Sequence, residues 1–302
     1  MEGNGPMPDR PTRVVLDCDT ANEIDDQFAI AYALGSPALD VRGVISVHDT
    51  LIHGAGSVAL YQEEAERVVR LCGKAGIVPC LRGAIGPMND RTTPVPSEGL
   101  DFLIAEARQG PLTIIATGPI TDVASLLLAA PEVRDTLRVV WLGGFPDAET
   151  FARWRLAELN GRADIAAWRV LLEQPVALLQ LPGWPGVVKL AVEVEPYAAE
   201  LRALGRPVAT YLAEITVAWM ERRAASRRDA QRHKVIWDAV NVAAVVHPAS
   251  VTVVPLPSPT LDVAGAHDFD HPGRIVDVVM DLDAAWILND MRAALLRLPA
   301  VV

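Results

Sequence analysis

Cysteine is scarce in this sequence, and its positions argue against two common kinds of site. The chain of 302 residues has three cysteines, Cys18, Cys72 and Cys80. Their scattered spacing does not match the paired ligands of a zinc site. An odd number of widely separated cysteines also argues against a disulfide framework. We therefore expect buried, reduced thiols.

Long apolar runs and an excess of positive charge are also missing. No window reaches about 18 uninterrupted apolar residues, and residues 1–11 are polar and rich in proline and glycine, unlike the apolar segment of a signal peptide. The formal net charge of -11 argues against nucleic acid as a partner, because phosphate contacts need basic surface. We expect a cytoplasmic protein with no membrane or nucleic-acid partner, and a flexible tail over residues 1–11.

Apolar residues are plentiful enough to fill one large domain. Hydrophobic residues make up 51% of the chain and charged residues 22%, with no shift in composition along it. Short β-branched runs alternate with longer stretches of helical periodicity, a pattern typical of βαβ units. The sequence predicts a single domain over residues 1–302, with an α/β fold: a Rossmann-like open, mainly parallel β-sheet with helices on both faces.

The expected elements follow from this alternation and from the glycines and prolines that end each run. Strands are predicted at 14–17, 41–47, 77–81, 112–116, 139–142, 176–179, 251–254 and 275–280, and helices at 25–34, 54–71, 99–107, 123–130, 163–172 and 284–298. The region 196–239 is mostly helical by composition, and its basic run 222–228 is interpreted as a solvated helix face. The tryptophans are expected in the core or at partner surfaces, apart from Trp237, which is treated below.

The segment 17–26 carries five carboxylates directly after the first predicted strand: Asp17, Asp19, Glu23, Asp25 and Asp26. Like charges a few ångströms apart repel by several kcal/mol once they are partly desolvated. A bound cation is the simplest remedy, and oxygen donors favour calcium or magnesium over zinc or copper. The alternative is a helix start decorated with acidic residues to suit the helix dipole.

Other polar residues also follow predicted strands. Ligands of open α/β sheets bind beyond the carboxyl ends of the strands, and the segments 48–50, 117–122 and the residues after 143–144 occupy such positions. Asp238 is an isolated carboxylate at the start of an apolar helical stretch, where it either needs a partner or serves as a helix N-cap. Together these segments would line one mouth of the sheet.

The order of these motifs resembles the inosine/uridine-preferring nucleoside hydrolase family. Asp17-Cys18-Asp19 followed by Asp25-Asp26 resembles the family's metal-binding opening. Further matches follow in the family's order. Residues 117–122 are similar to the family's Thr-Gly-Pro-Leu-Thr-Asn turn, and residues 140–144 are similar to its apolar strand that ends in paired glycines. Glu158-Leu159-Asn160 is similar to its Glu-Phe-Asn motif, and Trp237-Asp238 lies where the family has His-Asp. Ordered agreement over nearly the whole chain, from Val14 to about Leu298, is stronger than any single motif.

The resemblance implies a set of ligands for a calcium ion. In the family pattern Asp19, Asp26, the backbone carbonyl of Thr117 and Asp238 bind Ca²⁺. The same pattern makes Asp19 the catalytic base for a metal-activated water.

The resemblance also implies the substrate contacts and the reaction. Asp25 would hold a ribose hydroxyl, and Glu158 and Asn160 would hold the far hydroxyls of the sugar. The expected reaction is calcium-dependent hydrolysis of the N-glycosidic bond of ribonucleosides, or of a related riboside, to ribose and free base. By the same analogy we expect a homo-oligomer, a dimer or a tetramer.

Three positions depart from the family pattern. The family spaces its aspartates as Asp-x-x-x-Asp-Asp, whereas two additional residues lie between Asp19 and Asp25. The longer loop either places Asn22 or Glu23 near the sugar or only lengthens the turn. The segment 48–50 lacks the family's asparagine. Trp237 replaces a histidine that protonates the leaving base in many members; a tryptophan is no general acid, but its face can stack on a purine.

The acid that protonates the leaving group is therefore unassigned. His48, His53 and His233 are candidates, although a lone histidine is more often an ordinary polar residue. The segment 267–271 suggests a second metal site or, more simply, a solvated turn.

Two other functions remain open at this stage. One is a nucleoside- or sugar-binding protein with altered or lost catalysis, suggested by Trp237 and by the altered segment 48–50. The other is an aspartyl-type phosphohydrolase, suggested by Asp17-Cys18-Asp19, although nothing downstream resembles the lysine and second acidic motif that such chemistry needs.

Overall fold

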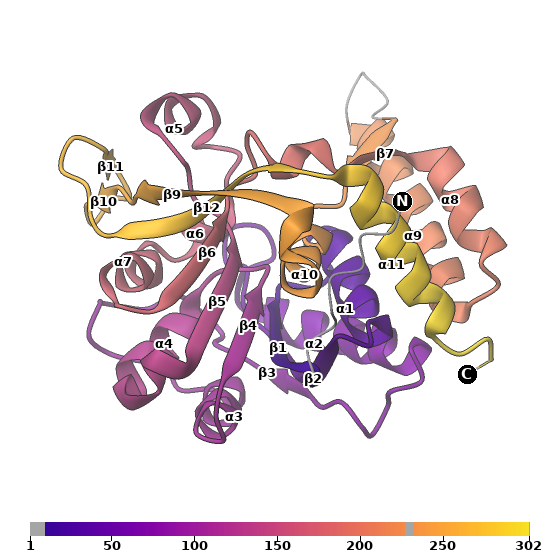
Figure 1. Cartoon of the computed structure of the whole chain (residues 1–302), viewed down its shortest axis with the longest axis horizontal. Coiled ribbons are helices and arrows are strands. Elements are labelled where there is room, and N and C mark those ends of the chain that lie inside the picture. Colours follow the sequence, from indigo (N-terminus) through magenta and orange to yellow (C-terminus); the bar gives the residue numbers. More distant parts are fainter. Residues whose placement is uncertain (1–9, 227–231, 302) are drawn as a thin grey trace.

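The computed structural model describes residues 10–226 and 232–301, so most of the predicted tail 1–11 lies outside the described residues. An eight-stranded sheet in the order β3-β2-β1-β4-β5-β6-β12-β9 forms the centre (Figure 1). Its strands are β1 (Thr12–Cys18), β2 (Leu39–Ser46), β3 (Cys80–Arg82), β4 (Leu112–Ala116), β5 (Leu137–Leu142), β6 (Ala177–Leu181), β9 (Val251–Pro257) and β12 (Ile275–Leu282). All neighbours pair in parallel except β12 and β9. The predicted mainly parallel sheet is confirmed.

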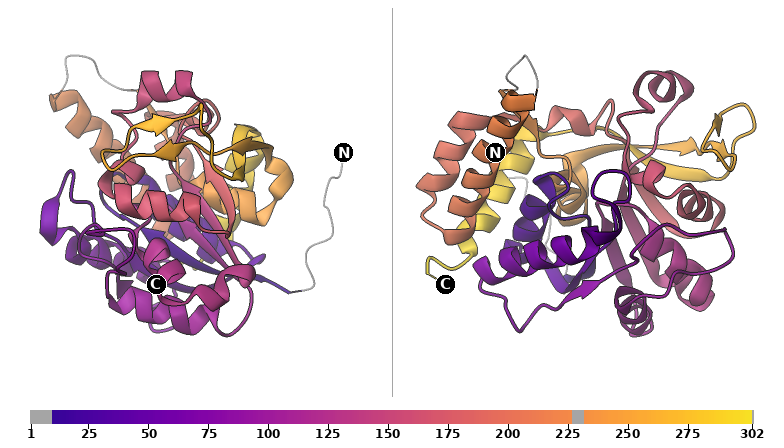
Figure 2. Two further views of the ribbon diagram at one scale, coloured as in Figure 1. Left: turned by 90° about the vertical axis from the view of Figure 1, so that its left-hand side faces the viewer. Right: turned by 180° about the vertical axis from the view of Figure 1, so that it is seen from behind.

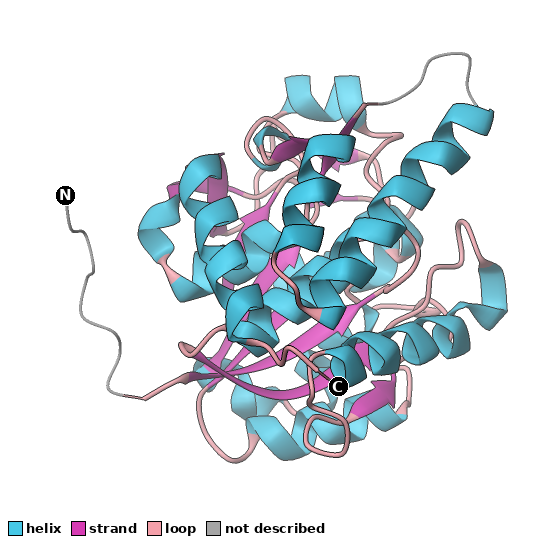
Figure 3. Ribbon diagram, turned by 90° about the vertical axis from the view of Figure 1, so that its right-hand side faces the viewer, coloured by secondary structure: helices cyan, strands magenta, loops and turns pink. Residues whose placement is uncertain are grey.

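Helices cover both faces of this sheet (Figures 2 and 3). One core layer includes side chains of α1 (Asp25–Gly35), α2 (Ser57–Leu71), α8 (Val194–Ala203), α9 (Pro207–Ser226), α10 (Ala239–Val246) and α11 (Ala284–Arg297). The other layer includes side chains of α3 (Glu98–Ala107), α4 (Thr121–Ala129) and α7 (Ile165–Glu173).

Strand β1 shows why the central strands have continuous apolar sequences. Val14 and Leu16 pack into the first core layer, and Val15 between them packs into the second. Successive side chains of a strand point to opposite faces, so a strand covered on both faces needs apolar residues at every position. Strand β4 has the same character, because all five of its residues are buried.

The structure differs from the sequence prediction in several elements. The strand expected at 77–81 is wrong at its start, because β3 begins only at Cys80, after a turn that includes Gly76 with a φ of 73° and Pro79. Helix α5 (Ala148–Trp154) was not predicted; it has no buried residue to create an apolar period, and Asp147 caps it by accepting from the Thr150 amide at 2.7 Å. The region 196–239, which was expected to be mostly helical, also contains strand β8 (His233–Val235), and β8 pairs with β7 (Ala191–Glu193), which lies before this region.

The basic run 222–228 is only partly as predicted. Arg222 is exposed, but Arg223 is half-buried, forms an ion pair with Glu23 and lies 5.5 Å from the Trp219 ring. Arg227 and Arg228 fall outside the described residues. The run therefore includes one residue that joins α9 to the acidic loop after β1.

The other composition-based expectations have mixed outcomes. Cys18 and Cys72 are buried free thiols as expected, whereas Cys80 is half-buried. The tryptophans divide into a buried group, Trp141, Trp168 and Trp219, and a half-buried group, Trp154, Trp184 and Trp286. None of the described helices has the length and apolar character needed to cross a membrane.

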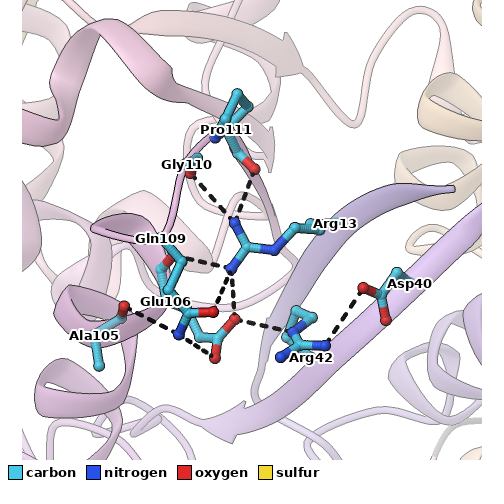
Figure 4. Close-up of polar contacts among 8 residues, drawn as sticks. All are labelled: Arg13, Asp40, Arg42, Ala105, Glu106, Gln109, Gly110 and Pro111. Atoms are coloured by element: carbon cyan, nitrogen blue, oxygen red, sulfur yellow. Dashed lines mark hydrogen bonds and ion pairs between the residues drawn. The ribbon is translucent and has the colours of Figure 1, made fainter. Parts of the chain in front are cut away.

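A charge network ties α3 to the amino-terminal ends of β1 and β2, where Figure 4 shows Glu106 between two arginines. Glu106 Oε2 accepts from Arg13 Nη2 at 2.7 Å and from Arg42 Nε at 3.0 Å, and Arg13 also donates to the Gly110 and Pro111 carbonyls. Burial alone would raise the pKa of Glu106, but the hydrogen bonds and charges of Arg42 and Arg13 lower it overall. The ionised carboxylate therefore stabilises the fold.

We expect Glu106→Gln to lower the free energy of unfolding by about 1 to 2 kcal/mol at pH 7, because it breaks two ion pairs at a largely buried carboxylate. The folded-state pKa is depressed, so this stabilisation is present above the ordinary Glu value and is lost as the pH falls through the folded-state pKa. Urea unfolding at pH 7 and at pH 4 measures the difference. Glu132→Gln, which breaks the exposed pair with Arg108, is the matched control and should change stability much less. Equal effects of the two variants would contradict the prediction.

Candidate active site

Three segments far apart in the sequence meet at the carboxyl edge of the sheet. The Thr117 amide, after β4, donates to the Asp17 carbonyl of β1 at 2.9 Å. Asn241 of α10 donates to the carbonyls of Ala116 and Val140 at 3.2 Å each, which anchors α10 on β4 and β5. Asp238, at the start of α10, is therefore held at the same edge as the loop after β1.

The three predicted carboxylate ligands are buried within range of one another's charge. Asp19 is 5% exposed, and Asp26 and Asp238 are each 2% exposed. Burial and the charge of Asp25 raise the pKa of Asp26 to about 7. Burial, followed by the charge of Asp26, raises the pKa of Asp19 well above its usual range. Burial, followed by the charges of Asp25 and Asp26, also raises the pKa of Asp238 well above its usual range.

Asp238 does not behave as a helix cap. It occupies the N-cap position of α10 but makes no capping hydrogen bond, and its Oδ1 has no hydrogen-bond partner among the described residues. A buried carboxylate oxygen without a donor is costly. The alternative interpretation of Asp238 as an N-cap is therefore wrong, and its need for a positive partner remains.

Asp17 is a further buried carboxylate, for which the sequence predicted no individual role. It is fully buried, and neither of its carboxylate oxygens has a hydrogen-bond partner in the described part of the chain. Burial, with the charges of Asp122 and Asp26, raises the pKa of Asp17 well above its usual range. Its position directly after the apolar residues Val14, Val15 and Leu16 of β1 was the available signal.

Two of the carboxylates accept short hydrogen bonds from neutral donors. Thr117 Oγ1 donates to Asp26 Oδ1 at 2.7 Å, and Asn22 Nδ2 donates to Asp19 Oδ2 at 2.8 Å. Over residues 10–226 and 232–301, no three His, Cys, Asp or Glu side chains are arranged to hold a metal ion by themselves. The donors at this edge are nonetheless all oxygens, and the orphaned Asp238 Oδ1 lies among mutually repelling carboxylates. This chemistry fits a hard divalent cation.

Asp25 differs from its neighbours because it has a positive partner. Its Oδ1 accepts from Lys234 Nζ at 3.0 Å, and Lys234 also donates to Glu23 Oε2 at 2.7 Å. Burial raises the pKa of Asp25, while the charge of Lys234 opposes that shift. Lys234 was not predicted as a site residue; the available signal was a lysine next to the apolar residues that precede Asp238.

Glu158 and Asn160 follow α5 and form hydrogen bonds with main-chain groups near this edge. Glu158 is buried, and its two oxygens accept from the amides of Gly161 at 2.9 Å and Arg162 at 3.3 Å, at the start of α6 (Asn160–Ala163). Asn160 Nδ2 donates to the Thr117 carbonyl at 2.7 Å and to the Leu142 carbonyl at 2.9 Å. Asn160 thus contacts the carbonyl that the family pattern makes a metal ligand.

Trp237 is the first member of a row of aromatic rings. Its ring centroid lies 5.4 Å from that of Trp184, in the segment after β6, with the planes tilted by 60°. Trp184 stacks on Trp154 of α5 at 4.5 Å with nearly parallel planes, and the Arg153 guanidinium lies 5.0 Å from the Trp154 ring. The unpredicted helix α5 therefore contributes to the surroundings of Trp237.

The candidate histidines have other partners. His48 is buried with Nε2 3.0 Å from Thr121 Oγ1, and burial lowers the pKa of His48 to about 4. His53 Nδ1 lies 2.8 Å from the Tyr61 hydroxyl, and His233 is exposed beside Glu193.

The segment 267–271 shows no second metal site within the part of the chain that the structure describes. His271 is exposed and pairs with Asp268 at 2.8 Å, as expected for a solvated turn. His267 instead stacks on Phe151 at 4.4 Å, and burial lowers the pKa of His267 to about 4. His267 lies on β11 (His267–Asp268), which pairs with β10 (Thr260–Leu261), so its contact with Phe151 packs this strand pair against α5.

An open parallel sheet with a buried acidic cluster at its carboxyl edge is the architecture of an α/β enzyme. The sequence profile described as "Inosine-uridine preferring nucleoside hydrolase" matches residues 14–288. The chain belongs to this family. It is an N-glycosyl hydrolase that converts ribonucleosides to ribose and free base, and its family is in general metal-dependent. The phosphohydrolase alternative has no support.

Individual relatives agree with the family assignment. The pyrimidine-specific ribonucleoside hydrolase RihA of Escherichia coli O1:K1 is 28% identical over 228 residues, which cover 69% of this chain and 71% of that protein. A purine-preferring ribonucleoside hydrolase from Gardnerella vaginalis superposes with a TM-score of 0.74 at 21% identity, over 94% of this chain and 98% of that one. An inosine-uridine preferring enzyme from Bacillus anthracis has a TM-score of 0.68 at 16% identity, over 95% and 100%. At such identities the two structures show the shared fold alone.

The acidic cluster predicts an unusual pH dependence of stability in the presence of a chelator. The pKa of Asp26 is raised from 3.8 to about 7, so the native state holds a proton that the unfolded chain releases, and the contribution of Asp26 to stability falls as the pH rises through this range. We expect Asp26→Asn to be more stable than the wild type by on the order of 2 kcal/mol at pH 8, with the gap narrowing toward pH 5. Urea unfolding in chelator at both pH values measures it.

The exposed Asp101, on α3, offers a matched control. Asp101→Asn should leave stability and its pH dependence close to those of the wild type. A destabilised Asp26→Asn at pH 8, or a gap that widens toward pH 5, would contradict the prediction.

Proposed function

We propose that this protein is a calcium-dependent ribonucleoside hydrolase in which Asp19, Asp26, the carbonyl of Thr117 and Asp238 bind Ca²⁺. The observation that carries the proposal is the unsatisfied negative charge at one edge: three buried carboxylates repel one another, and Asp238 Oδ1 lacks a donor among the described residues. All the donors are oxygens, which calcium prefers. The family assignment supports the choice of reaction.

Calcium, when bound, supplies a positive charge that lowers the pKa of the attacking water and grips the ribose diol. Asp19 is the catalytic base in this proposal: the Asn22 amide holds its Oδ2 at 2.8 Å, which fixes the carboxylate that takes the proton. Burial of Asp19 keeps bulk water away from it. The ionised carboxylates around the anomeric carbon stabilise an oxocarbenium-like transition state.

The sugar contacts follow the family pattern. Asp25 accepts a hydrogen bond from a ribose hydroxyl, and its ion pair with Lys234 favours the charged form of the carboxylate. In this proposal the sugar is also contacted by Asn22, Glu158 and Asn160. The contacts of Glu158 with amides of α6 and of Asn160 with the Thr117 carbonyl give these two side chains fixed orientations, which favours precise binding of a small polar ligand.

Trp237 contacts the leaving base in this proposal. A tryptophan does not donate a proton to a ring nitrogen as an acid, so its contribution is stacking on the base. The tilted contact with Trp184 and the stack on Trp154 hold the indole in place. The rigid aromatic row favours flat leaving groups.

The chain is further proposed to be a single domain that acts in the cytoplasm as a homo-oligomer, a dimer or a tetramer, as analogy with the family suggests. Static light scattering of the purified protein tests the oligomeric state. A mass equal to one chain would overturn that part of the proposal.

The calcium assignment predicts that protein stripped with a chelator releases base from inosine or uridine at least about 100-fold more slowly, and that added Ca²⁺ restores the rate. Asp26→Asn should not recover and should bind Ca²⁺ at least about tenfold more weakly by calorimetry, because it removes one charged ligand. Asp101→Asn is the matched control and should behave as the wild type. Equal Ca²⁺ binding by the wild type and Asp26→Asn would overturn the assignment.

The same assay separates an enzyme from a binding protein. A protein that only binds nucleosides would be stabilised against heat by them and would release no free base. Release of base with multiple turnovers supports the hydrolase.

The stacking role predicts that Trp237→Leu raises KM for purine ribosides by about tenfold, because base-aromatic stacking contributes on the order of 1 to 3 kcal/mol. Pyrimidine ribosides should be affected less, and Trp237→Phe should retain most of the affinity. Steady-state kinetics with inosine and uridine measure these effects. Trp286→Leu, which alters a half-buried tryptophan stacked on His247, is the control. An equal change for purines and pyrimidines would contradict stacking.

A further inference from the structure

The loop between Asp19 and Asp25 is joined to a distant part of the chain by one lysine. Lys234 lies on β8, opposite Val192 of β7 in the antiparallel pair. Its Nζ contacts Glu23 Oε2 at 2.7 Å and Asp25 Oδ1 at 3.0 Å, so it bridges the two carboxylates at the end of this loop. The two partners lie 211 and 209 residues away in sequence.

Lys234 is buried in a way that requires both contacts. Its side chain is 1% exposed, and a buried ammonium group is costly unless charged or aromatic partners surround it. Besides the two carboxylates, the Trp219 ring lies 5.3 Å from Nζ, close enough for a cation–π interaction. Lys234 therefore has a defined position in the interior, held by three partners, and is not a solvated surface charge.

The loop that Lys234 holds has a conformation that needs support. Ala21 has a φ of 82°, a left-handed conformation that is unfavourable for a residue with a Cβ atom. Glu23 is also bound by Arg223 of α9, so the end of the loop is fixed to both α9 and β8. The two additional residues between Asp19 and Asp25 are thus accommodated in a bulge whose far end is clamped by cations.

The lysine also divides the acidic cluster into two parts. Glu23 and Asp25 have a positive partner in Lys234, whereas no described lysine or arginine forms an ion pair with Asp19, Asp26 or Asp238. The uncompensated group is the one assigned to Ca²⁺. The compensated Asp25 is the one assigned to the sugar.

We propose that Lys234 is a positioning residue for ribose recognition: it fixes the carboxylate of Asp25 for a ribose hydroxyl, and through Glu23 it clamps the lengthened loop that carries the site. This inference rests on the proposed function. It concerns binding of the sugar and not the metal or the leaving base.

The test compares Lys234→Met with the wild type on substrates that differ in one hydroxyl. We expect KM for inosine and uridine to rise at least about tenfold in Lys234→Met, because Asp25 loses its orientation. The 2′-deoxy and 3′-deoxy forms are both tested, and one of them lacks the hydroxyl that Asp25 contacts. For that form, the same substitution should change KM less than about threefold. Lys189→Met, which removes a surface ion pair with Asp281, is the matched control and should change neither.

The double variant Lys234→Met/Asp25→Asn sharpens the test. If Lys234 acts through Asp25, removing the lysine from the Asp25→Asn protein should have little further effect on KM for ribonucleosides. A full additional penalty in the double variant, or an equal penalty for ribo- and deoxyribonucleosides, would overturn the proposal, since a purely structural role lowers activity without regard to the sugar hydroxyls.

Two further measurements keep the result decisive. If Lys234→Met does not fold, Glu23→Gln weakens the contact of Lys234 with the loop without burying an unpaired charge. Its rise in KM should be smaller but should depend on the sugar hydroxyl in the same way. If the calcium-loaded protein binds inosine and its deoxy forms but releases no base, calorimetry compares their affinities in place of KM. A wild type that binds nucleosides but releases no base would overturn the proposed function, and the binding comparison would still decide the role of Lys234.

Discussion

The structure depends on the burial of like charges at the carboxyl edge of the sheet. Asp19, Asp26 and Asp238 are withdrawn from water within range of one another's charge, and Asp17 lies fully buried beside them. Such an arrangement costs stability unless a positive partner is present. Lys234 compensates Glu23 and Asp25, and Arg223 also pairs with Glu23, whereas no lysine or arginine in the described part of the chain forms an ion pair with Asp19, Asp26 or Asp238. The fold therefore requires positive charge at the carboxyl edge of the sheet, where we propose that the nucleoside binds.

The framework around the cluster is rigid enough to sustain this cost. Two core layers cover β1 on both faces, and asparagine amides join the ends of the central strands: Asn241 to Ala116 and Val140, and Asn160 to Thr117 and Leu142. The main-chain carbonyls at the edge are held in fixed directions by these contacts. A charge network at the opposite ends of β1 and β2 secures α3. Stability is thus supplied away from the site, while the site itself retains repulsion.

Local patterns in the sequence predicted the fold and the acidic edge, because each signal lies within a few residues. Alternating apolar runs predicted the parallel sheet, and residues 17–26 place their carboxylates side by side in the chain. Lys234 was missed because its partners lie about 210 residues away, and α5 was missed because a helix without buried residues has no apolar period. The interpretation of 222–228 as a solvated face was incomplete for the same reason, since the contact of Arg223 with Glu23 is purely tertiary.

We propose that a divalent cation completes this acidic edge and holds the sugar against it. Long-wavelength anomalous diffraction from crystals grown with Ca²⁺ and soaked with ribose is the most direct test of this proposal. We predict one anomalous peak bonded to oxygens of Asp19, Asp26, Thr117 and Asp238, with the ribose diol on the same ion and Asp25 on a hydroxyl. A calcium ion bound by other residues, or ribose density away from this edge, would contradict the proposal.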